Sequence, residues 1–448
     1  MKYDVIVAGA GLAGTSLALS LAAQRRSVLL LDARPAPSGI AHALPAAGFD
    51  QRIYAISPAS VAWLTDLKLW QALDAARIAP VYDMHIHGDA PDALRAPWQS
   101  AASSAAAQGS TGLPGLPGVP GVPGVPGVPG VPGVPGLHLS AYRAGVGELC
   151  TIVEERELAR VLTQALSFAS GVEVLRPVEL ASLQCDADAA RLTLADGRVV
   201  SAKLIVAADG ARSWLRGAAG IASDDIDYAH TAVVANFEIE KLHFNCAAQW
   251  FRAEADGASS VLAWLPLPHN QVSMVWSGPD ALAAELLALP PGALAARVAE
   301  AGGHWFGALS PAGAAASFPL RNQRARSLIA PRVALVGDAA HVVHPLAGQG
   351  LNLGLGDCAE LARVLGGAVS AQSAMTVRDP GDALVLRRYE RARKAALLEM
   401  HMVTHGLQRL FSSQQRAVRV LRNMGLNLIG QLPVLPRLLV QRATRTFQ

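Results

Sequence analysis

The stretch YDVIVAGAGLAG, residues 3–14, decides the fold of this 448-residue chain. A strand-like apolar run leads into the glycine-rich turn at 9–14, and a helical pattern continues to Arg25. A second apolar strand over 28–31 then ends in Asp32. Strand, glycine turn, helix and strand in this order predict the βαβ unit of a parallel sheet.

The three glycines of this turn have separate expected roles. Gly9 makes the tight turn, Gly11 lets a pyrophosphate approach bare backbone, and Gly14 lets helix and strand pack closely. The helix N-terminus attracts the anion, and Asp32 is placed to accept hydrogen bonds from a ribose. The predicted dinucleotide contacts are Gly9, Ala10, Gly11, Leu12, Ala13, Gly14 and Asp32. This motif alone does not distinguish FAD from NAD.

Two later apolar strands also end in small residues and an Asp. The run 203–207 leads to Asp209, and the run 332–336 leads to Gly337 and Asp338. Ligands of parallel sheets bind at such carboxyl ends, so all three strand ends are expected at one site. Between the two strands, alternating stretches across 225–320 predict a mostly antiparallel sheet with one wet or ligand-facing side.

The segment GDAAHVVHPLAGQGLNLG, residues 337–354, decides between the two dinucleotides. Asp338 can bond a ribityl or phosphate-side hydroxyl, while Gly348 and Gly350 let backbone lie against a flat ring. The helix that follows would aim its N–H groups at the ring edge that becomes negative on reduction. This arrangement favours a flavin.

The same segment resembles the flavin-contacting signature of the group A flavoprotein monooxygenases, which have the para-hydroxybenzoate hydroxylase fold. It resembles the ubiquinone-biosynthesis hydroxylase family more closely. Further stretches that agree with this family are 52–57, 142–145, 208–213 and 234–237. The resemblance spans the chain except about residues 90–136.

The resemblance implies FAD as the cofactor and assigns its parts by position. Gly9 to Gly14 and Asp32 take the ADP half, and Asp338 takes the ribityl-pyrophosphate region. The isoalloxazine is assigned to Gly348, Gln349, Gly350, Leu351 and Asn352. Asp209 matches a strand-end motif that serves both FAD and the nicotinamide route. Arg52 matches an arginine near the flavin, with a surface salt bridge as its alternative.

The resemblance also implies the reaction. No second GxGxxG follows a strand, so no separate nicotinamide domain is expected, and in this family NADPH or NADH docks only transiently. O2 then forms a flavin C4a-hydroperoxide that hydroxylates a phenol. The expected substrate is a polyprenylated phenol of ubiquinone biosynthesis. Two alternatives stay open: a hydroxylase of a small soluble aromatic, and a catalytically silent scaffold that keeps the flavin fold.

Composition excludes several other classes of protein. With 51% hydrophobic and 16% charged residues the chain can build a large core, and a net charge of +3 without a basic stripe argues against nucleic acid. The four cysteines stand far apart, which predicts free thiols in a cytoplasmic protein. No apolar run approaches the ~20 residues of a membrane span.

The predicted fold class is α/β: a Rossmann-like FAD-binding domain, a second and mostly antiparallel substrate domain, and C-terminal helices. The FAD-binding domain is discontinuous, with 1–80, 141–224 and 321–400, and the substrate domain takes 81–89, 137–140 and 225–320. Residues 90–136 form a low-complexity insert that carries six Val-Pro-Gly triplets. It is interpreted as a tolerated insertion at the tip of a hairpin, or else as an interaction or trimerising element.

The C-terminal region 401–448 is predicted to be basic and helical, because it holds seven arginines and no Asp or Glu. It either packs on the flavin domain or lies on the inner face of the membrane, which leaves a peripheral membrane or biosynthetic-complex contact open. The arginine-rich stretch 387–394 is expected to be a solvated helix face.

His341 and His344 flank the flavin motif, but no partner carboxylate is evident for either. A structural or flavin-wall role is therefore favoured over acid–base chemistry, and no catalytic residue is assigned. No metal site is expected either, since a third ligand is lacking. Four aromatic residues on the alternating strands are interpreted as core packing, with a pocket wall as the alternative: Trp250, Phe251, Trp264 and Trp276.

Overall fold

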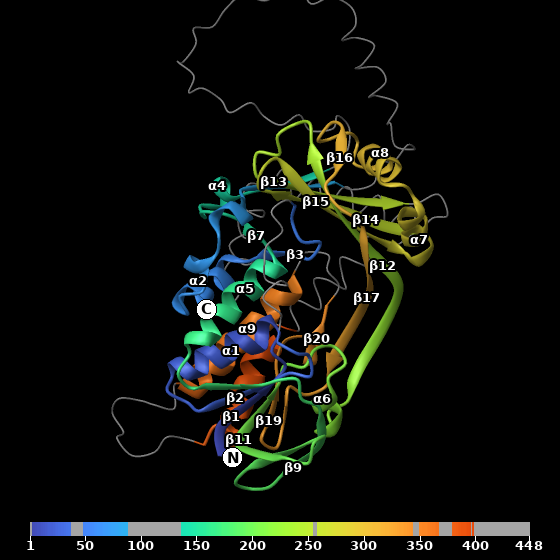
Figure 1. The fold of residues 1–448 in the computed structure, drawn as a ribbon. Helices are drawn as coiled ribbons and strands as arrows, with labels where there is room; N and C mark the ends of the chain where they lie inside the picture. The colour runs from blue at the N-terminus through green and yellow to red at the C-terminus, as the bar shows by residue number, and fades with distance from the viewer. Residues whose placement is uncertain are drawn as a thin grey trace, which may run out of the picture.

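The computed structural model of the chain describes residues 2–36, 48–87, 136–253, 258–343, 349–366, 379–395 and 397. Its described strands form three sheets, and Figure 1 shows the largest two at opposite ends of the molecule. The predicted mixed α/β fold, with its parallel and antiparallel sheets, is confirmed. The division into domains at the predicted boundaries stays a prediction.

The first sheet is built around the predicted βαβ unit. Its parallel core runs in the order β19-β11-β1-β2-β8, with antiparallel strands added beside β11 and β19. Its strands are β1 (Lys2–Ala8), β2 (Val28–Leu31), β8 (Val172–Leu175), β9 (Leu180–Cys185), β10 (Ala190–Leu194), β11 (Val199–Ala207), β18 (Ile329–Ala330) and β19 (Val333–Leu335). Four of these parallel strands, β1, β2, β11 and β19, carry buried apolar runs, as a sheet covered on both faces requires, whereas the edge strand β8 is only partly buried.

Helices α1 (Leu12–Ala23) and α9 (Gln349–Gly366) pack together against this sheet. The other helices of this part are α2 (Pro58–Asp66), α5 (Glu155–Phe168) and α6 (Trp214–Ala218), with the short 3-10 turns η2 (Trp70–Ala72), η3 (Ala75–Arg77) and η4 (Gly337–Ala339). A three-stranded antiparallel sheet lies beside them: β3 (Ile53–Ile56), β4 (Ile78–Val81) and β7 (Cys150–Glu154).

The second large sheet is mostly antiparallel. Its strands are β5 (Asp83–His87), β6 (Gly136–Ser140), β12 (Ser223–Ile239), β13 (Cys246–Ala253), β14 (Ser259–Leu267), β15 (Gln271–Pro279), β16 (Leu309–Pro311), β17 (Ala316–Ala325) and β20 (His341–Val342). The short helix α4 (Ala141–Ala144) follows β6, while α7 (Asp280–Ala288) and α8 (Pro291–Ala301) lie beside the sheet. In Figure 1 the long strands β12 and β17 run from this sheet toward the parallel one.

The predicted hairpin is confirmed: β5 pairs antiparallel with β6, in a register that places Met84 opposite Leu139. The insert between its arms, 88–135, lies outside the described residues. A feature that the sequence did not predict is the parallel pairing of β5 with β13, which attaches the hairpin to the edge of the antiparallel sheet.

The tryptophans of this sheet form core, as the sequence analysis favoured. Trp250, Trp264 and Trp276 pack with α7 and α8 in one buried cluster. Phe251 follows Trp250 in the strand and therefore points to the other face. That other face is free of these two helices and carries small side chains such as Ala263 of β14 and Val275 of β15.

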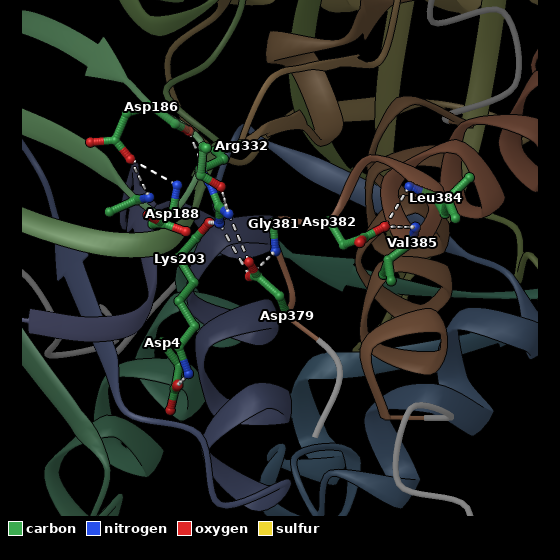
Figure 2. A network of polar contacts seen from close by, with 12 residues as sticks. Asp4, Asp186, Asp188, Lys203, Arg332, Asp379, Gly381, Asp382, Leu384 and Val385 are labelled. Atoms are coloured by element: carbon green, nitrogen blue, oxygen red, sulfur yellow. Dashed lines mark hydrogen bonds and ion pairs between the residues drawn. The ribbon is translucent and has the colours of Figure 1, made fainter. Parts of the chain in front are cut away.

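Figure 2 shows a polar network at the start of the helix over 383–395. Arg332 donates to Lys203 O at 2.8 Å and to Asp379 Oδ2 at 2.7 Å, so it ties the chain before this helix to β11. Asp382 then accepts the backbone N–H of Leu384 at 2.7 Å and caps the helix. The network thereby fixes where the helix starts and which of its faces points inward.

All four cysteines are unpaired thiols. None of the described helices is both long enough and apolar enough to cross a membrane. The C-terminal region 401–448, on which the sequence analysis placed a membrane contact, lies outside the described residues.

Candidate functional site

The predicted site begins where the parallel strands end. Gly9 N donates to Leu31 O at 2.7 Å, and Ala208 N donates to Ala8 O at 2.7 Å. Val336 N donates to Ala207 O at 3.0 Å. Each bond joins neighbouring strands at their last residues. The residues that follow these strands therefore lie at the same edge of the sheet. They are Gly9, Asp32, Asp209 and Asp338.

The three glycines of the first turn differ in their surroundings. Gly9 has φ +110°, and a Cβ there would overlap the carbonyl oxygen of Ala208. A Cβ on Gly14 would overlap the carbonyl oxygen of Gly9. Nothing lies within 4 Å of a Cβ on Gly11. Gly9 and Gly14 thus serve the protein's own packing, whereas Gly11 borders open space that a ligand can fill.

The N-terminus of α1 faces this space, and no capping side chain accepts hydrogen bonds from its first N–H groups. Gly11 is its N-cap residue and makes no side-chain hydrogen bond, and the first turn contains no acidic residue. The leading N–H groups of a helix have no intrahelical acceptor, and the helix dipole favours an anion there. The geometry around Gly11 therefore fits a pyrophosphate group.

Asp32 closes the turn from the neighbouring strand. Its carboxylate accepts Ala10 N at 2.7 Å and Arg34 N at 2.7 Å. Burial acts to raise the pKa of this carboxyl, but the hydrogen bonds from Arg34 and Ala10 outweigh it and hold the pKa below its usual value. The guanidinium of Arg34 occupies the other acceptor positions of this carboxylate, with Nε 3.2 Å from Oδ1 and Nη2 3.3 Å from Oδ2. A ribose hydroxyl would take the place of this solvent-exposed arginine side chain.

The second motif comes into contact with the first, although about 320 residues separate them in the chain. Gly337, with φ +60°, would place a Cβ 3.5 Å from the side chain of Ala13. A Cβ on Gly354 of α9 would lie 3.1 Å from Gly337 Cα. Cys358 Sγ donates to Ala13 O at 3.3 Å. The start of α1, the turn η4 and helix α9 therefore form one packed unit.

Asp338 stands exposed on η4 beside this unit. Desolvation by the surrounding protein raises the pKa of its carboxyl, while the charges of His341 and Arg52 act against that rise. A carboxyl group that is open to solvent yet largely surrounded by protein is suited to bind a hydroxyl of a ligand in the same space.

Behind Asp338 lies a buried ionic cluster, which we call the Asp357 cluster: Asp357, His341 and Arg393. Asp357 Oδ2 is 2.6 Å from His341 Nε2 and accepts Gly337 N at 2.9 Å, and Asp357 Oδ1 accepts Arg393 Nε at 2.7 Å. All three side chains are at least 96% buried. Burial acts to raise the pKa of Asp357, but His341 and Arg393 hold it below its usual value.

Two expectations are corrected by this cluster. The sequence analysis found no partner carboxylate for His341, whereas Asp357 is that partner. It also expected a solvated face over 387–394, which holds for Arg387 and Arg388 but is wrong for Arg393. The missed signal is spacing, because Val385, Tyr389, Arg393 and Leu397 recur every four residues and form one buried face.

The predicted helix is α9, which begins at Gln349, inside the second motif rather than after it. Gly350 was expected in the turn before this helix, but it lies in the first turn of the helix itself. Asn352 is not free to face a ligand with its side chain, because its Oδ1 accepts Ser57 N at 2.9 Å and its Nδ2 donates to Ala55 O at 2.7 Å. It fastens α9 to β3 and α2. Leu351 and Leu12 line one apolar cavity together. Gly348 and His344 lie outside the described residues.

Arg52 and Asp209 both have protein partners. Arg52 Nη1 lies 3.1 Å from Glu155 Oε2, so the alternative of a salt bridge is present, and its guanidinium lies 5.1 Å from the Phe318 ring centroid. Asp209 accepts Leu215 N at 3.1 Å at the start of α6. A flavin or nicotinamide contact of either residue stays a prediction. The described part of the chain contains no group of three or more His, Cys, Asp or Glu arranged to hold a metal ion.

These features fit a dinucleotide-binding site, and comparison with known proteins identifies the family. The family described as FAD binding domain matches residues 2–404. The ubiquinone hydroxylase UbiL of Rhodospirillum rubrum is 33% identical over 99% of this chain and 90% of its own length. The 3-demethoxyubiquinol 3-hydroxylase of Escherichia coli is 31% identical over 97% of this chain and 96% of its own length.

Among solved structures, the p-nitrophenol 4-monooxygenase PnpA of Pseudomonas putida DLL-E4 matches with a TM-score of 0.70 and 18% identity. This match covers 100% of this chain and 98% of that one, and it shows the shared fold. The chain therefore belongs to the FAD-binding monooxygenase family, among the ubiquinone-biosynthesis hydroxylases.

Proposed function

We propose that this enzyme hydroxylates the aromatic ring of a polyprenylated phenol in ubiquinone biosynthesis, with O2 as co-substrate and NADPH or NADH as reductant. The observation that carries the proposal is the unit formed by the open N-terminus of α1, η4 and α9 at one edge of the parallel sheet. Its residues fit FAD, and the relatives named as ubiquinone hydroxylases match nearly the whole chain.

In this proposal the turn 9–14 and the first N–H groups of α1 bind the pyrophosphate, and Asp32 accepts the ribose hydroxyls. Asp338 bonds the ribityl side, and the backbone of 348–352 lies against the isoalloxazine. FAD, when bound, supplies the redox chemistry that transfers one oxygen atom of O2 to the ring. The protein binds the cofactor, orients the phenol and keeps water out.

We assign the phenol to the face of the antiparallel sheet that α7 and α8 leave free. On its strands the residues of the buried cluster under α7 and α8 alternate with side chains that point to this face, among them Val234, Ala263 and Val275. Asn236 on the same face donates to Asp50 O at 3.0 Å and so holds this face next to Arg52. An apolar ring would therefore lie between this sheet and the flavin-binding edge.

The nicotinamide step is tested by anaerobic addition of NADPH or NADH to the FAD-loaded protein. We expect the flavin absorbance to bleach at least about tenfold faster when a polyprenylated demethoxy-phenol in detergent is present. Equal stimulation by tail-less phenols would favour the alternative of a small soluble aromatic substrate. A bound flavin that neither nicotinamide reduces would support the silent scaffold.

The role of Asp32 is tested by Asp32→Asn. Asparagine keeps the shape but removes the charge that faces the ribose, so we expect FAD to bind about tenfold more weakly in a fluorescence titration. Asp196→Asn is a matched control, since Asp196 also accepts the N–H and the guanidinium of an arginine two residues on, but at a surface turn. Equal FAD affinity of both variants and the unmodified protein would rule out the assigned contact.

A further inference from the structure

Two polar side chains on the free face of the antiparallel sheet have hydrogen-bonding capacity that the protein does not use. They are Asn236 of β12 and Ser273 of β15, which we call the polar pair. Asn236 is 3% exposed and Ser273 is 0% exposed. Asn236 Oδ1 and Ser273 Oγ nevertheless have no hydrogen-bond partner in the described part of the chain. Buried polar atoms without a partner are rare, because each costs free energy, so the polar pair points to a group that would complete these bonds.

The members of the polar pair are direct neighbours across two strands. Asn236 stands opposite Ser273 in the register of β12 with β15. Phe237 and Met274, the next residues along each strand, belong to the buried cluster under α7 and α8, so the polar pair points to the other face. Side chains in such positions have Cβ atoms about 4.5–5.5 Å apart. One ligand oxygen can therefore lie within hydrogen-bonding distance of both side chains.

The protein itself sets the orientation of the Asn236 amide. Its Nδ2 donates to Phe49 O at 3.1 Å and to Asp50 O at 3.0 Å, so the atom left without a partner is the acceptor Oδ1. Ser273 Oγ can donate as well as accept. A hydroxyl group donates one hydrogen bond and accepts another, so it matches both side chains. An ether oxygen only accepts and would leave Asn236 Oδ1 unpaired.

An apolar strip continues from the polar pair along the same face. Val234 and Val275 lie two residues further along β12 and β15 and stand opposite each other, with Ala263 of β14 beside Val275. Val275 and Ala263 are partly exposed, whereas Ser273 is not. The polar pair thus lies at the closed end of this strip, and an apolar aromatic ring suits the strip itself.

The strip leads toward the flavin-binding edge. Ala232, the next residue of β12 on this face, stands opposite Phe318 of β17. The guanidinium of Arg52 lies 5.1 Å from the Phe318 ring centroid, and Arg52 is within electrostatic reach of Asp338. A ring whose oxygen is held by the polar pair would therefore lie on Val234 with its far side toward this edge.

We propose that the polar pair binds the phenolic hydroxyl group of the substrate. Asn236 Oδ1 accepts a hydrogen bond from this hydroxyl group, and Ser273 Oγ donates one to its oxygen. The assignment rests on the proposed function, because it takes a phenol as the substrate. It makes the polar pair the feature that selects a free hydroxyl group over an alkylated oxygen. A site built to bond a hydroxyl group rejects an analogue without one, since its buried partners are then left unpaired.

The test compares a polyprenylated phenol with its O-methyl ether, which keeps the ring and the tail. Each is titrated in detergent into the full-length FAD-loaded protein, and binding is followed by the change in the flavin absorbance spectrum. The unmodified protein should bind the phenol at least about 30-fold more tightly than the ether. Ser273→Ala should weaken binding of the phenol about tenfold and leave binding of the ether unchanged. Its unfolding midpoint should not fall, because the variant removes a buried hydroxyl group that has no partner.

Ser260→Ala is the matched control. Ser260 is a buried serine on the helix-covered face of the same sheet, and its Oγ accepts Trp276 Nε1 at 3.1 Å. The control should lower the unfolding midpoint, because Trp276 loses its acceptor, and should bind both compounds like the unmodified protein. Asn236→Ala is a second variant. It should also lose the preference for the phenol, but with a lower unfolding midpoint, because Phe49 O and Asp50 O lose their donor.

The proposal is overturned if Ser273→Ala keeps the full preference for the phenol, or if it lowers the unfolding midpoint as Ser260→Ala does. Equal binding of phenol and ether by the unmodified protein would overturn it as well. If phenol-stimulated flavin reduction persists in that case, the proposed function stands without the polar pair. A preference for the hydroxyl group that depends on Ser273 but occurs only with tail-less phenols would support the polar pair and reject the polyprenylated substrate.

Discussion

Gly11→Ala should weaken FAD binding about 10- to 100-fold and leave the folded apoprotein intact. The added methyl group meets no protein atom within 4 Å, so it costs the apoprotein nothing by overlap. It does enter the space assigned to the pyrophosphate, where an overlap of this size costs about 1–3 kcal/mol. The two readouts are the dissociation constant for FAD and the unfolding midpoint of the apoprotein.

For Gly14→Ala we expect the opposite result, which is a loss of apoprotein stability rather than a loss of FAD affinity alone. Its methyl group would overlap the carbonyl oxygen of Gly9, which is backbone and cannot move aside without shifting the turn. We expect the apoprotein to lose about 3 kcal/mol or more of unfolding free energy before any ligand is added. Gly147→Ala is the neutral control, because its Cβ meets nothing and its φ is not positive. Equal destabilisation by Gly11→Ala and Gly14→Ala would contradict the division of roles.

Asp357→Asn should destabilise the enzyme by about 3–5 kcal/mol, because it leaves the buried guanidinium of Arg393 without a counterion. The measurement is the free energy of unfolding in urea at neutral pH. Glu360→Gln is the control on the same helix: it removes the partner of Arg363 in an exposed pair and should cost at most about 1 kcal/mol. Similar losses for both variants would refute the buried-charge argument.

A double variant and a pH series sharpen this test. Arg393→Met combined with Asp357→Asn removes both charges, so its loss should be smaller than the sum of the two single losses. The folded-state pKa of Asp357 lies below its usual 3.8, so the carboxylate stabilises the fold above that pH and this stabilisation is lost as the pH falls further. The unmodified protein should therefore lose more stability below pH 3.8 than Asp357→Asn does.

The Asp357 cluster also connects the stability of the fold with the geometry of the proposed FAD site. Asp357 accepts Gly337 N, and Gly337 precedes Asp338, so the same carboxylate that neutralises Arg393 fixes the turn η4. We expect Asp357→Asn to weaken FAD binding as well as folding. The role of Asp357 in the enzyme is thus to position the site rather than to touch the substrate.

The sequence predicted those parts of the fold whose signals are local. Apolar periodicity located β1 and β2 within one residue and the end of α1 within two residues, and the antiparallel sheet expected across 225–320 contains β14 and β15 and most of β12. The hairpin of β5 and β6 was predicted because both arms alternate, even with the insert between them. Local periodicity suffices here because each element buries one face or runs wholly through the core.

The missed contacts all involve residues far apart in the chain. The parallel pairing of β5 with β13 joins segments separated by more than 150 residues, and no local pattern specifies such a pair. Arg393 looked like a surface residue within an arginine-rich run, since only the position of its helix decides which arginine is buried. Asn352 was assigned to the ring, yet its side chain is taken up by Ser57 and Ala55.

The sequence by itself determined the dinucleotide-binding unit, the flavin motif and the family, because glycines that must admit a ligand or a neighbouring backbone are tied to fixed positions in the chain. The tertiary structure alone decided which carboxylate pairs with His341, which side chains line the free face of the antiparallel sheet, and that the backbone of Tyr82 is bonded to both Ala141 and Asn245. Such contacts depend on how distant elements pack, and packing is set by the whole core rather than by any short stretch.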